Sequence, residues 1–528
     1  MSLAWILLLP LAGGLAAWIA GRWSDLWPRW ISLGTALLHL LLLLVTWGVF
    51  FAHNETAQGG WLMVYKQPWI PQLGISFHLA VDGLSLLLLL LTSFLTVLAV
   101  LTSWSAVTRS VGFFHFNLLL ILTALSGVFI AFDLFLFFAF WEISLLPLYF
   151  LIGIWGYENR VYATTKFFII TQGSGLLMLL AILGLVVVHW QSSGVMTFDY
   201  LELVGTPMSE ATAWWLMLGF FIAFAVKLPV VPFHTWLPDA HTQAPTAGSV
   251  ALAGLVLKIG AYGMLRLVVP LFPQAAADFA LVAMILAVVG ILYGALLALG
   301  QTDLKRMVAY TSISHMGFVL LGIFAWNELA LQGAVIIMLS HGFSAAALFM
   351  MVGDLQHRAH SRDLGSFGGL WAIMPRMGGV GLFFAMASLG LPGLASFIGE
   401  FLVLMGAFQV NVPLTVLASV GLVAATVYSL WMMQKVYYGA RTGDLQLDDT
   451  SGRERVIMAS LIGATLGLGL YPQPVLTTSG NALAQMREVV DKARDSAKAR
   501  ASAQRSAAEE ARTADAAASI APEGGRRR

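Results

Sequence analysis

The stretch AFAVKLPVVPFHTWLP, residues 223–238, decides the fold. It carries Lys227 at the end of an apolar run, and Pro229 and Pro232 follow at once. Proline has no backbone N–H and its ring clashes with the preceding turn, so a helix that enters this stretch must break. A break of this kind frees backbone carbonyl groups and leaves room for water beside the lysine. We therefore predict a broken membrane-spanning helix that holds a titratable lysine.

The composition is that of a large membrane protein. Of 528 residues, 59% are hydrophobic and 10% are charged, and the mean hydropathy is +0.83. Runs such as Leu84 to Val100 are continuously apolar at helix length, which excludes the alternating strands of an outer-membrane barrel. Each crossing needs about 20 residues, so we predict an all-α integral membrane protein with about 14 transmembrane helices.

The residue counts also exclude several function classes. The chain has no cysteine, so it has no disulfide and no thiolate-held zinc or iron–sulfur site. Its net charge of +1 argues against nucleic acid as a partner. No Gly-rich phosphate-binding loop follows a strand. We expect neither a catalytic redox group nor a metal nor a cofactor bound by this chain.

A second helix break corresponds to the first. The sequence GLPGLASFIGEF, residues 390–401, places Pro392 among glycines, and Glu400 follows. Helix breaks at corresponding places in two halves of a chain are typical of transporters built from internal repeats. The two breaks lie five predicted crossings apart, and an odd number of crossings inverts the second copy in the membrane. We predict two inverted five-helix repeats, each containing a broken helix.

The repeats divide the chain into five predicted parts. These are residues 1–110 with helices one to three, 111–270 with the first repeat, 271–440 with the second repeat, 441–480 with a loop and helix 14, and 481–528 as a polar, flexible tail.

Basic residues set the predicted orientation, because loops on the cytoplasmic side carry an excess of lysine and arginine. With the N-terminus on the periplasmic side, the outer loops hold only Lys66 and Arg266. The inner loops then hold Arg22, Arg29, Arg109, Arg160, Lys305, Arg306, Arg358, Arg362, Arg376, Arg441, Arg453 and Arg455.

Four ionisable residues are predicted to lie deep in the bilayer: Glu142, Lys227, Lys258 and Glu400. Charges in hydrocarbon are rare, and they mark ion pathways when they face protein or water. Lysine can lose its proton when desolvated, whereas arginine effectively cannot. We predict that all four residues carry protons. The structural alternatives are permanently protonated carboxyl groups, a static ion pair between Lys227 and Glu142, and a Lys258 side chain that extends to the membrane surface.

Histidines in or near the same helices are candidate relay groups. His234, His315 and His341, with His241 beside them, fall in or near the seventh, tenth and eleventh predicted spans. Imidazole titrates near neutral pH and can pass a proton on, although a single buried histidine is more often a satisfied interior group. His234 and His241 lack the i, i+4 spacing of a helical zinc pair, so we predict no metal site.

Together these motifs resemble a known family over roughly residues 75–440. They look like the antiporter-like subunits of proton-pumping NADH:quinone oxidoreductase, respiratory complex I. Within this family, a glutamate in the second broken helix, here Glu400, is similar to the subunit M branch, whereas siblings L and N and the cation-antiporter relatives usually place lysine there. The runs that carry the resemblance are FWEISLLPLYFLIGIWG (140–156), AFAVKLPVVPFHTWLPDAHTQAPTAGSVALAGLVLKIGAYGMLR (223–266), TDLKRMVAYTSISHMGF (302–318) and GLPGLASFIGEF (390–401).

The resemblance implies roles for the site residues. Glu142 and Lys227 would act as a coupled pair, Lys258 as a central relay, His315 as a relay histidine and Glu400 as the group near the exit. NADH, FMN, iron–sulfur clusters and quinone would belong to the wider complex. The implied partners are other membrane subunits including siblings L and N, the redox arm subunits and the lipid bilayer, and the implied location is the bacterial inner membrane.

Other functions remain open from the sequence. A multi-subunit cation/proton antiporter and a membrane-bound hydrogenase use similar subunits, with sodium exchange or a different electron donor in place of NADH oxidation. A membrane scaffold that conducts nothing would need no charges at mid-depth, so the four ionisable residues and the two helix breaks oppose it.

Overall fold

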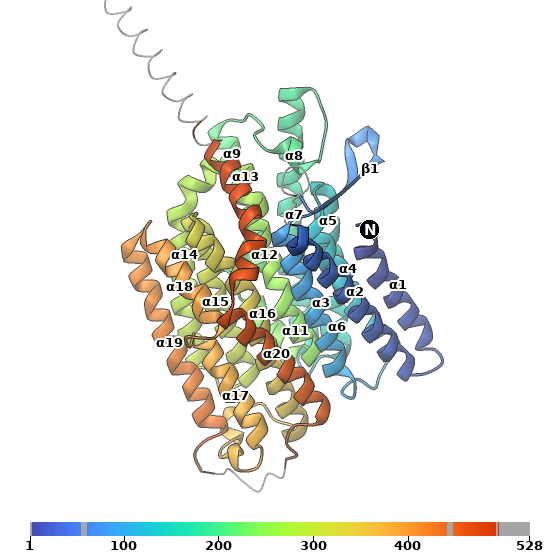
Figure 1. Cartoon of the computed structure of the whole chain (residues 1–528), viewed down its shortest axis with the longest axis vertical. Coiled ribbons are helices and arrows are strands. Elements are labelled where there is room, and N and C mark those ends of the chain that lie inside the picture. The colour runs from blue at the N-terminus through green and yellow to red at the C-terminus, as the bar shows by residue number, and fades with distance from the viewer. Residues whose placement is uncertain (1–2, 54–60, 441–446, 493–494, 496–528) are drawn as a thin grey trace, which may run out of the picture.

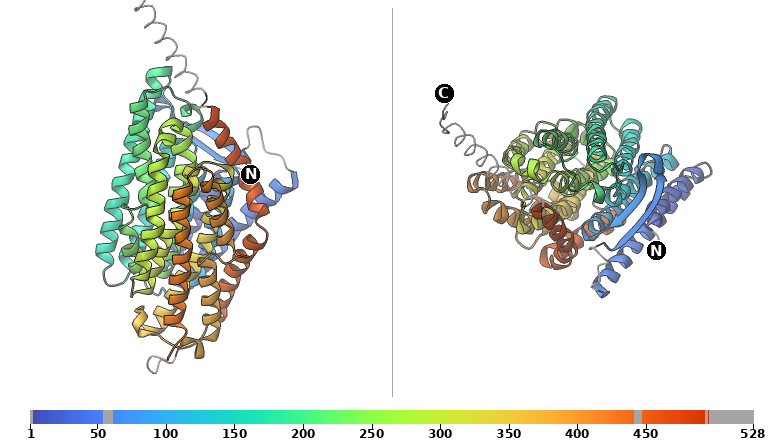
Figure 2. Two further views of the ribbon diagram at one scale, coloured as in Figure 1. Left: turned by 90° about the vertical axis from the view of Figure 1, so that its left-hand side faces the viewer. Right: turned by 90° about the horizontal axis from the view of Figure 1, so that it is seen from above.

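The structure of the protein is a computed structural model that describes residues 3–53, 61–440, 447–492 and 495. It is a bundle of long helices that run side by side (Figures 1 and 2). A strand hairpin and α8 lie at the upper end in Figure 1, and α17 lies at the lower end. Arg441 and most of the predicted tail over 481–528 lie outside the described residues.

The N-terminal half contains α1 (Ala4–Ala20), α2 (Leu26–His53), β1 (Met63–Ile70), η1 (Pro71–Leu73), β2 (Ile75–Val81), α3 (Gly83–Ser103), α4 (Val111–Ile130), α5 (Leu134–Ile143), α6 (Leu145–Trp155), α7 (Arg160–Ser193), α8 (Tyr200–Leu203), α9 (Glu210–Lys227), α10 (Trp236–Gln243), α11 (Thr246–Ala251), η2 (Leu252–Val256), α12 (Leu257–Gly263), η3 (Met264–Val268) and α13 (Val269–Leu271).

The C-terminal half contains α14 (Pro273–Leu299), α15 (Leu304–Ala325), α16 (Glu328–Ala359), η4 (Leu364–Ser366), η5 (Leu370–Ala372), α17 (Pro375–Ser388), α18 (Ala395–Phe408), α19 (Val412–Val436) and α20 (Gly452–Leu470). A helix over Gln473–Lys492 follows α20 at a bend of 69°. Helical structure therefore continues into the stretch predicted as a polar, flexible tail.

The helical membrane fold is confirmed. Within the described residues, 11 helices are long and apolar enough to cross a membrane, and the bent pair after residue 452 raises this number to 12. Two more predicted crossings are shorter: α1 has 17 residues, and α18 has 14 because the break divides its span. The count of about 14 and the inverted repeats stay predictions.

Both predicted helix breaks are present. Pro229 and Pro232 lie in the gap between α9 and α10, and Pro392 lies in the gap between α17 and α18. Gly390, in the second gap, has a φ of +77°, a conformation that glycine adopts without steric cost. The span that carries Glu142 is also interrupted, between α5 and α6. This third interruption was not predicted. The sequence PLYF follows it, and its proline has no backbone N–H to donate to the carbonyl group four residues earlier, so the sequence did carry a signal for this break.

The helix that carries Lys258 is irregular in a way that the sequence did not indicate. Two π-helical segments, η2 and η3, flank α12. Such segments widen the helix and are frequent at functional sites. Lys258 Nζ donates a hydrogen bond to the carbonyl oxygen of Ala253, inside η2, at 2.5 Å. The widened turn thus gives the lysine a backbone acceptor on its own helix.

Two basic residues predicted to lie in loops are buried, so these assignments were wrong. Lys305, predicted in an inner loop, lies in the first turn of α15 and is fully buried. Arg266, predicted in an outer loop, lies in η3 at 5% exposure and pairs with Asp82 at the N-terminus of α3. Charge patterns locate helix ends, but the packing of neighbouring elements determines the burial of a side chain.

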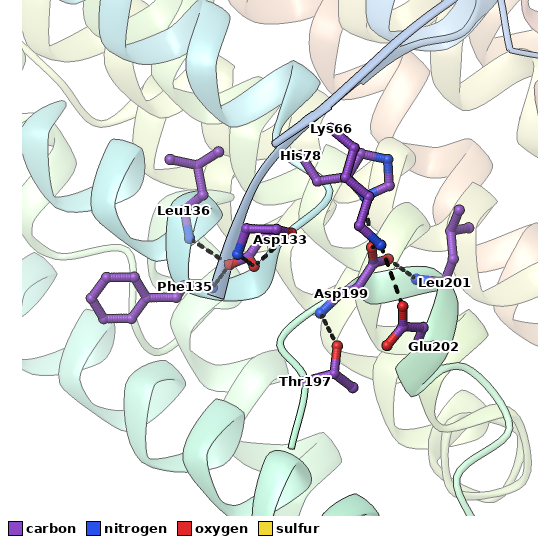
Figure 3. Close-up of polar contacts among 10 residues, drawn as sticks. Lys66, His78, Asp133, Phe135, Leu136, Thr197, Asp199, Leu201 and Glu202 are labelled. Carbon is purple, nitrogen blue, oxygen red and sulfur yellow. Dashed lines mark hydrogen bonds and ion pairs between the residues drawn. The ribbon is translucent and has the colours of Figure 1, made fainter. Parts of the chain in front are cut away.

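A β-hairpin is a departure from the predicted all-α structure. Strand β1 pairs antiparallel with β2, and two aspartates attach the hairpin to the bundle (Figure 3). Asp133, which caps α5, accepts a hydrogen bond from the backbone of Ser76 at 2.7 Å. Asp199, which caps α8, lies 2.8 Å from His78 Nδ1 and 2.6 Å from Lys66 Nζ. Each carboxylate therefore caps the N-terminus of a helix and also holds the hairpin.

The attachment at Asp199 depends on pH. Burial opposes ionisation of this carboxyl group, but hydrogen bonds from His78 and Lys66 outweigh burial and lower the pKa of Asp199 below its usual value. The same contact with Asp199 raises the pKa of Lys66. A carboxyl group whose folded pKa is lowered stabilises the fold above its unfolded pKa, and this contribution is lost as the pH falls through the folded pKa. We therefore expect the hairpin to be held firmly at neutral pH and loosened in acid.

Replacing Asp199 with Asn should loosen the hairpin, because the charge-assisted contacts to His78 and Lys66 are lost. We expect the free energy of local opening of residues 63–81 to fall by about 1–3 kcal/mol. Amide hydrogen exchange of the purified protein at neutral pH measures this change. Glu202→Gln is the control, because this exposed partner of Lys66 contributes about 0–1 kcal/mol. Unchanged protection in Asp199→Asn would show that the carboxylate does not hold the hairpin.

Candidate functional site

Glu142 lies near the end of α5 and faces α7. Its carboxylate contacts Gln172 and interacts electrostatically with Lys227. A Cβ added at Gly175 would lie 2.0 Å from Glu142 Oε1, so the carboxylate fills the space beside this glycine. Oε1 has no hydrogen-bond partner among the described residues. One acceptor atom of the carboxylate is thus free inside the bundle.

Lys227 is fully buried at the first helix break. Its Nζ lies 5.3 Å from the ring centroid of Trp141 and 5.7 Å from that of Phe167, and it has no hydrogen-bond partner among the described residues. Glu142 attracts it, yet no N–O distance of 4.0 Å or less joins the two described side chains. The alternative of a static ion pair is therefore not what the structure contains.

Lys258 and His341 are in direct contact at the centre of the bundle. Both side chains are buried, and Lys258 Nζ lies 2.8 Å from His341 Nδ1. His341 comes from α16, so this contact joins two helices that are far apart in the sequence. His341 Nε2 has no partner among the described residues. Lys258 points to a histidine, which contradicts the alternative that it extends to the membrane surface.

His315 and Glu400 form the next contact of the row. His315 Nδ1 lies 3.0 Å from Glu400 Oε1, and the ring centroids of His315 and His341 are 5.8 Å apart. His315 Nε2 lies 3.2 Å from the hydroxyl oxygens of Ser388 and Tyr428. These two hydroxyl groups were not predicted, since single polar residues in apolar helices are common and only the fold places them beside a histidine.

A cavity of about 230 Å³ adjoins the second helix break. Glu400, Gly390 and Thr426 line it together with apolar side chains. A Cβ added at Gly390 would lie 2.7 Å from Glu400 Oε2, so the carboxyl group occupies the space that this glycine leaves. A water molecule takes about 30 Å³ in the liquid, so several fit here. Glu400 therefore has one oxygen on His315 and one beside this cavity.

His234 and His241 lie outside this row of contacts. His234 lies in the gap between α9 and α10, with its ring 5.5 Å from that of Tyr293. His241 lies in α10 and stacks on Phe349, with ring centroids 4.5 Å apart. His234 Nδ1 and both ring nitrogens of His241 lack hydrogen-bond partners among the described residues.

The site thus has two parts that meet through backbone packing. The row from Lys258 to Glu400 has a direct contact at each end and a ring-to-ring separation of 5.8 Å between its two histidines, whereas Glu142 and Lys227 form a separate, looser pair. A Cβ added at Gly260 would lie 2.7 Å from Leu228 N and from Phe224 O, so α12 packs directly against the break in α9. In the part of the chain that the structure describes, no group of three or more His, Cys, Asp or Glu residues could hold a metal ion.

Comparison with known proteins identifies the family. The family model for NADH:quinone oxidoreductase/Mrp antiporter, TM, matches residues 131–426. NADH-quinone oxidoreductase subunit M of Pseudomonas aeruginosa is 53% identical over 488 residues, which cover 91% of this chain and 96% of the relative. The subunit M of Escherichia coli is 51% identical over 498 residues, which cover 92% and 98%. This chain belongs to the NADH:quinone oxidoreductase/Mrp antiporter family.

Solved structures share the fold of this chain. A chain of respiratory complex I from Thermus thermophilus matches with a TM-score of 0.83 at 30% identity, covering 93% of this chain and 99% of that one. A chain of the Mrp complex from Dietzia sp. matches with a TM-score of 0.78 at 21% identity, covering 92% and 98%, and shows the fold alone. The resemblance inferred from the sequence motifs is confirmed.

Gly175→Ala should displace the Glu142 carboxylate, because the added methyl group would occupy its position. We expect a folded, assembled protein, since alanine favours a helix by about 0.5–1 kcal/mol over glycine, but impaired proton translocation in membrane vesicles. Gly173→Ala is the matched control, because nothing lies within 4 Å of a Cβ there. Equal translocation by the two variants would contradict a role for the observed position of Glu142.

Proposed function

We propose that this chain is a proton-translocating membrane subunit of an NADH-quinone oxidoreductase, of the subunit M type, and that its buried Glu, Lys and His residues carry the protons. The likeness to curated subunit M proteins at 51–53% identity over nearly their whole length supports the assignment to the complex. Oxidation of NADH takes place elsewhere in this assembly, and the chain alone is not catalytic.

One observation carries the mechanism: Lys258, His341, His315 and Glu400 form a row of titratable groups across the membrane-spanning bundle. The distances along it are 2.8 Å, 5.8 Å between ring centroids, and 3.0 Å. Imidazole can accept a proton on one nitrogen and release one from the other. A proton on Lys258 can therefore pass through two histidines to Glu400 and leave through the cavity there.

In this proposal, Glu142 and Lys227 couple redox chemistry in the partner subunits to the movement of protons. Moving one proton against about 150 mV requires roughly 3.5 kcal/mol. At an effective dielectric constant of about 20, two opposite charges attract by about 4 kcal/mol at 4 Å and by about 2 kcal/mol at 8 Å. A change of a few ångströms in the separation of this loose pair, driven by redox chemistry in partner subunits, supplies a large share of the required energy.

The wider assembly follows from the same assignment. We infer that NADH, FMN, iron–sulfur clusters and quinone are bound by partner subunits, and that siblings L and N, the redox arm and lipid are the neighbours of this chain. We also infer that it lies in a bacterial inner membrane with its N-terminus on the periplasmic side. A cation/proton antiporter or a hydrogenase subunit would share this fold, but the curated relatives at 51–53% identity favour the NADH-linked complex.

Lys258→Arg tests the mechanism, because arginine keeps the positive charge but effectively cannot release its proton. We expect proton translocation in vesicles that hold the whole complex to be slowed at least about 100-fold, as for loss of a proton-transfer group. NADH oxidation with a soluble electron acceptor should be unchanged, and it reports correct assembly. Normal translocation by this variant would exclude Lys258 as a proton carrier.

A further inference from the structure

Two arginines from opposite ends of the sequence hold the short loop between α3 and α4. Arg29, at the start of α2, donates a hydrogen bond from Nη2 to the carbonyl oxygen of Val107 at 3.1 Å. Arg453, at the start of α20, donates from Nη2 to the hydroxyl oxygen of Ser105 at 2.6 Å. Both arginines are half-buried, and the Nε atom of each is buried without a hydrogen-bond partner among the described residues. A guanidinium group has five N–H donors, so each arginine has donors left for a ligand.

The nearby acidic residues do not neutralise these two arginines. Glu454 pairs with Arg358 instead, at 2.6 Å. Asp354 attracts Arg453 electrostatically. Within the described residues, however, no N–O distance of 4.0 Å or less joins Arg29 or Arg453 to a carboxylate. Two guanidinium groups on one short loop, without an anion between them, favour an anionic ligand.

Tryptophans place the two arginines at the membrane surface. Trp23, Trp27 and Trp30 are 77%, 62% and 56% exposed around the start of α2. The ring of Trp30 meets that of Trp104 edge-on, with ring centroids 4.9 Å apart. This end of α2 lies away from the β-hairpin (Figure 1). Tryptophan is enriched at the level of lipid headgroups, so the arginines lie at the depth of the lipid phosphates.

An apolar groove of about 580 Å³ lies between α2 and α20, on the same faces of these helices as the two arginines. Leu40 and Trp47 follow Arg29 by 11 and 18 residues, and Ala464 follows Arg453 by 11 residues. At 3.6 residues per turn, these positions lie within about 20° of the arginines around each helix. The two helices line the groove with Leu40, Leu44, Trp47, Ala464, Gly467 and Leu468, and side chains of α3 and α16 complete it.

A charged end and an apolar groove on one line fit an amphiphile. At 1.5 Å per residue, the groove begins about 16 Å from the arginines. The hydrocarbon core is about 30 Å thick, so one leaflet is about 15 Å deep. A lipid whose phosphate contacts the arginines therefore directs its acyl chains between α2 and α20, and the chain ends reach the groove. A zwitterionic headgroup would bring an ammonium group close to two guanidinium groups, which favours an anionic headgroup instead.

We propose that an anionic phospholipid binds between α2 and α20, with its phosphate group at Arg29 and Arg453 and an acyl chain in the groove. Arginine binds phosphate oxygens through two parallel N–H donors. Basic pockets between membrane-spanning helices are known headgroup sites on the cytoplasmic side, the side to which the basic loops assign this end of the bundle. The lipid joins the first helices of the chain to α20, and the proposal is independent of the proton pathway.

Photoreactive lipids test this site on the whole complex in vesicles. One probe is phosphatidylglycerol and the other is phosphatidylcholine, each with a diazirine at the end of an acyl chain, and peptide mass spectrometry locates the labelled residues. We expect phosphatidylglycerol to label the groove residues of α2 and α20 at least about 10-fold more than phosphatidylcholine, because charge-assisted hydrogen bonds hold it. The double variant Arg29→Gln/Arg453→Gln should reduce its labelling to the phosphatidylcholine level.

Arg455→Gln is the matched control. This exposed arginine lies two residues after Arg453, about 200° around α20 and so on the opposite side of the helix. It removes the same charge from the same helix and should leave labelling of the groove unchanged.

Gly467→Leu is the second variant, because Gly467 lines the groove and nothing lies within 4 Å of a Cβ there. The larger side chain takes up space in the groove, so we expect labelling by phosphatidylglycerol to fall while the yield of assembled complex is kept. If the double variant does not assemble, this variant and the comparison of the two lipids on the wild-type complex decide the question.

Three results would overturn the proposal. Equal labelling by the two lipids, or unchanged labelling in the assembled double variant, would show that the arginines do not select an anionic headgroup. Unchanged labelling in Gly467→Leu would show that the acyl chain lies elsewhere. Absence of labelling by both lipids would show that another protein covers the groove.

Discussion

The contact between Lys258 Nζ and His341 Nδ1, at 2.8 Å, is the interaction on which the rest of the structure depends. It brings two basic groups together in an apolar interior, where a polar group is stable only if it is hydrogen-bonded. The π-helical segment before α12 supplies one acceptor, the carbonyl oxygen of Ala253, and the long helix α16 supplies the histidine. The surrounding bundle keeps lipid away from this contact and so preserves its low-dielectric surroundings.

The two ends of the site use similar residues in different ways. At the second helix break, Glu400 contacts His315 directly and borders a cavity. At the first break, Glu142 and Lys227 interact across a longer distance, and each has an atom without a hydrogen bond among the described residues. A close contact passes protons, whereas a loose ion pair changes its energy when its separation changes. In the proposed mechanism, the loose pair responds to the partner subunits and the close contact at Glu400 releases the proton.

Charged residues at the ends of the bundle have a structural role that is distinct from transport. Asp82, Asp133 and Asp199 each cap a helix and also bind a neighbouring element. Asp82 holds Arg266, and the other two carboxylates hold the β-hairpin. One side chain thus satisfies helix N-terminal donors and fixes a second segment. These caps fix the hairpin end of the bundle.

The sequence alone determined the membrane fold, both helix breaks and the candidate residues Glu142, Lys227, Lys258 and Glu400, because apolar length, proline and buried charge are local properties of the chain. Only the tertiary structure decided which of these residues meet. It paired Lys258 with His341 and Glu400 with His315, added Ser388 and Tyr428, and separated Lys227 from Glu142. It also buried Lys305, which the charge pattern had placed in a loop. Contacts between helices that are distant in the sequence depend on packing, and the periodicity of a single helix carries no information about its neighbours.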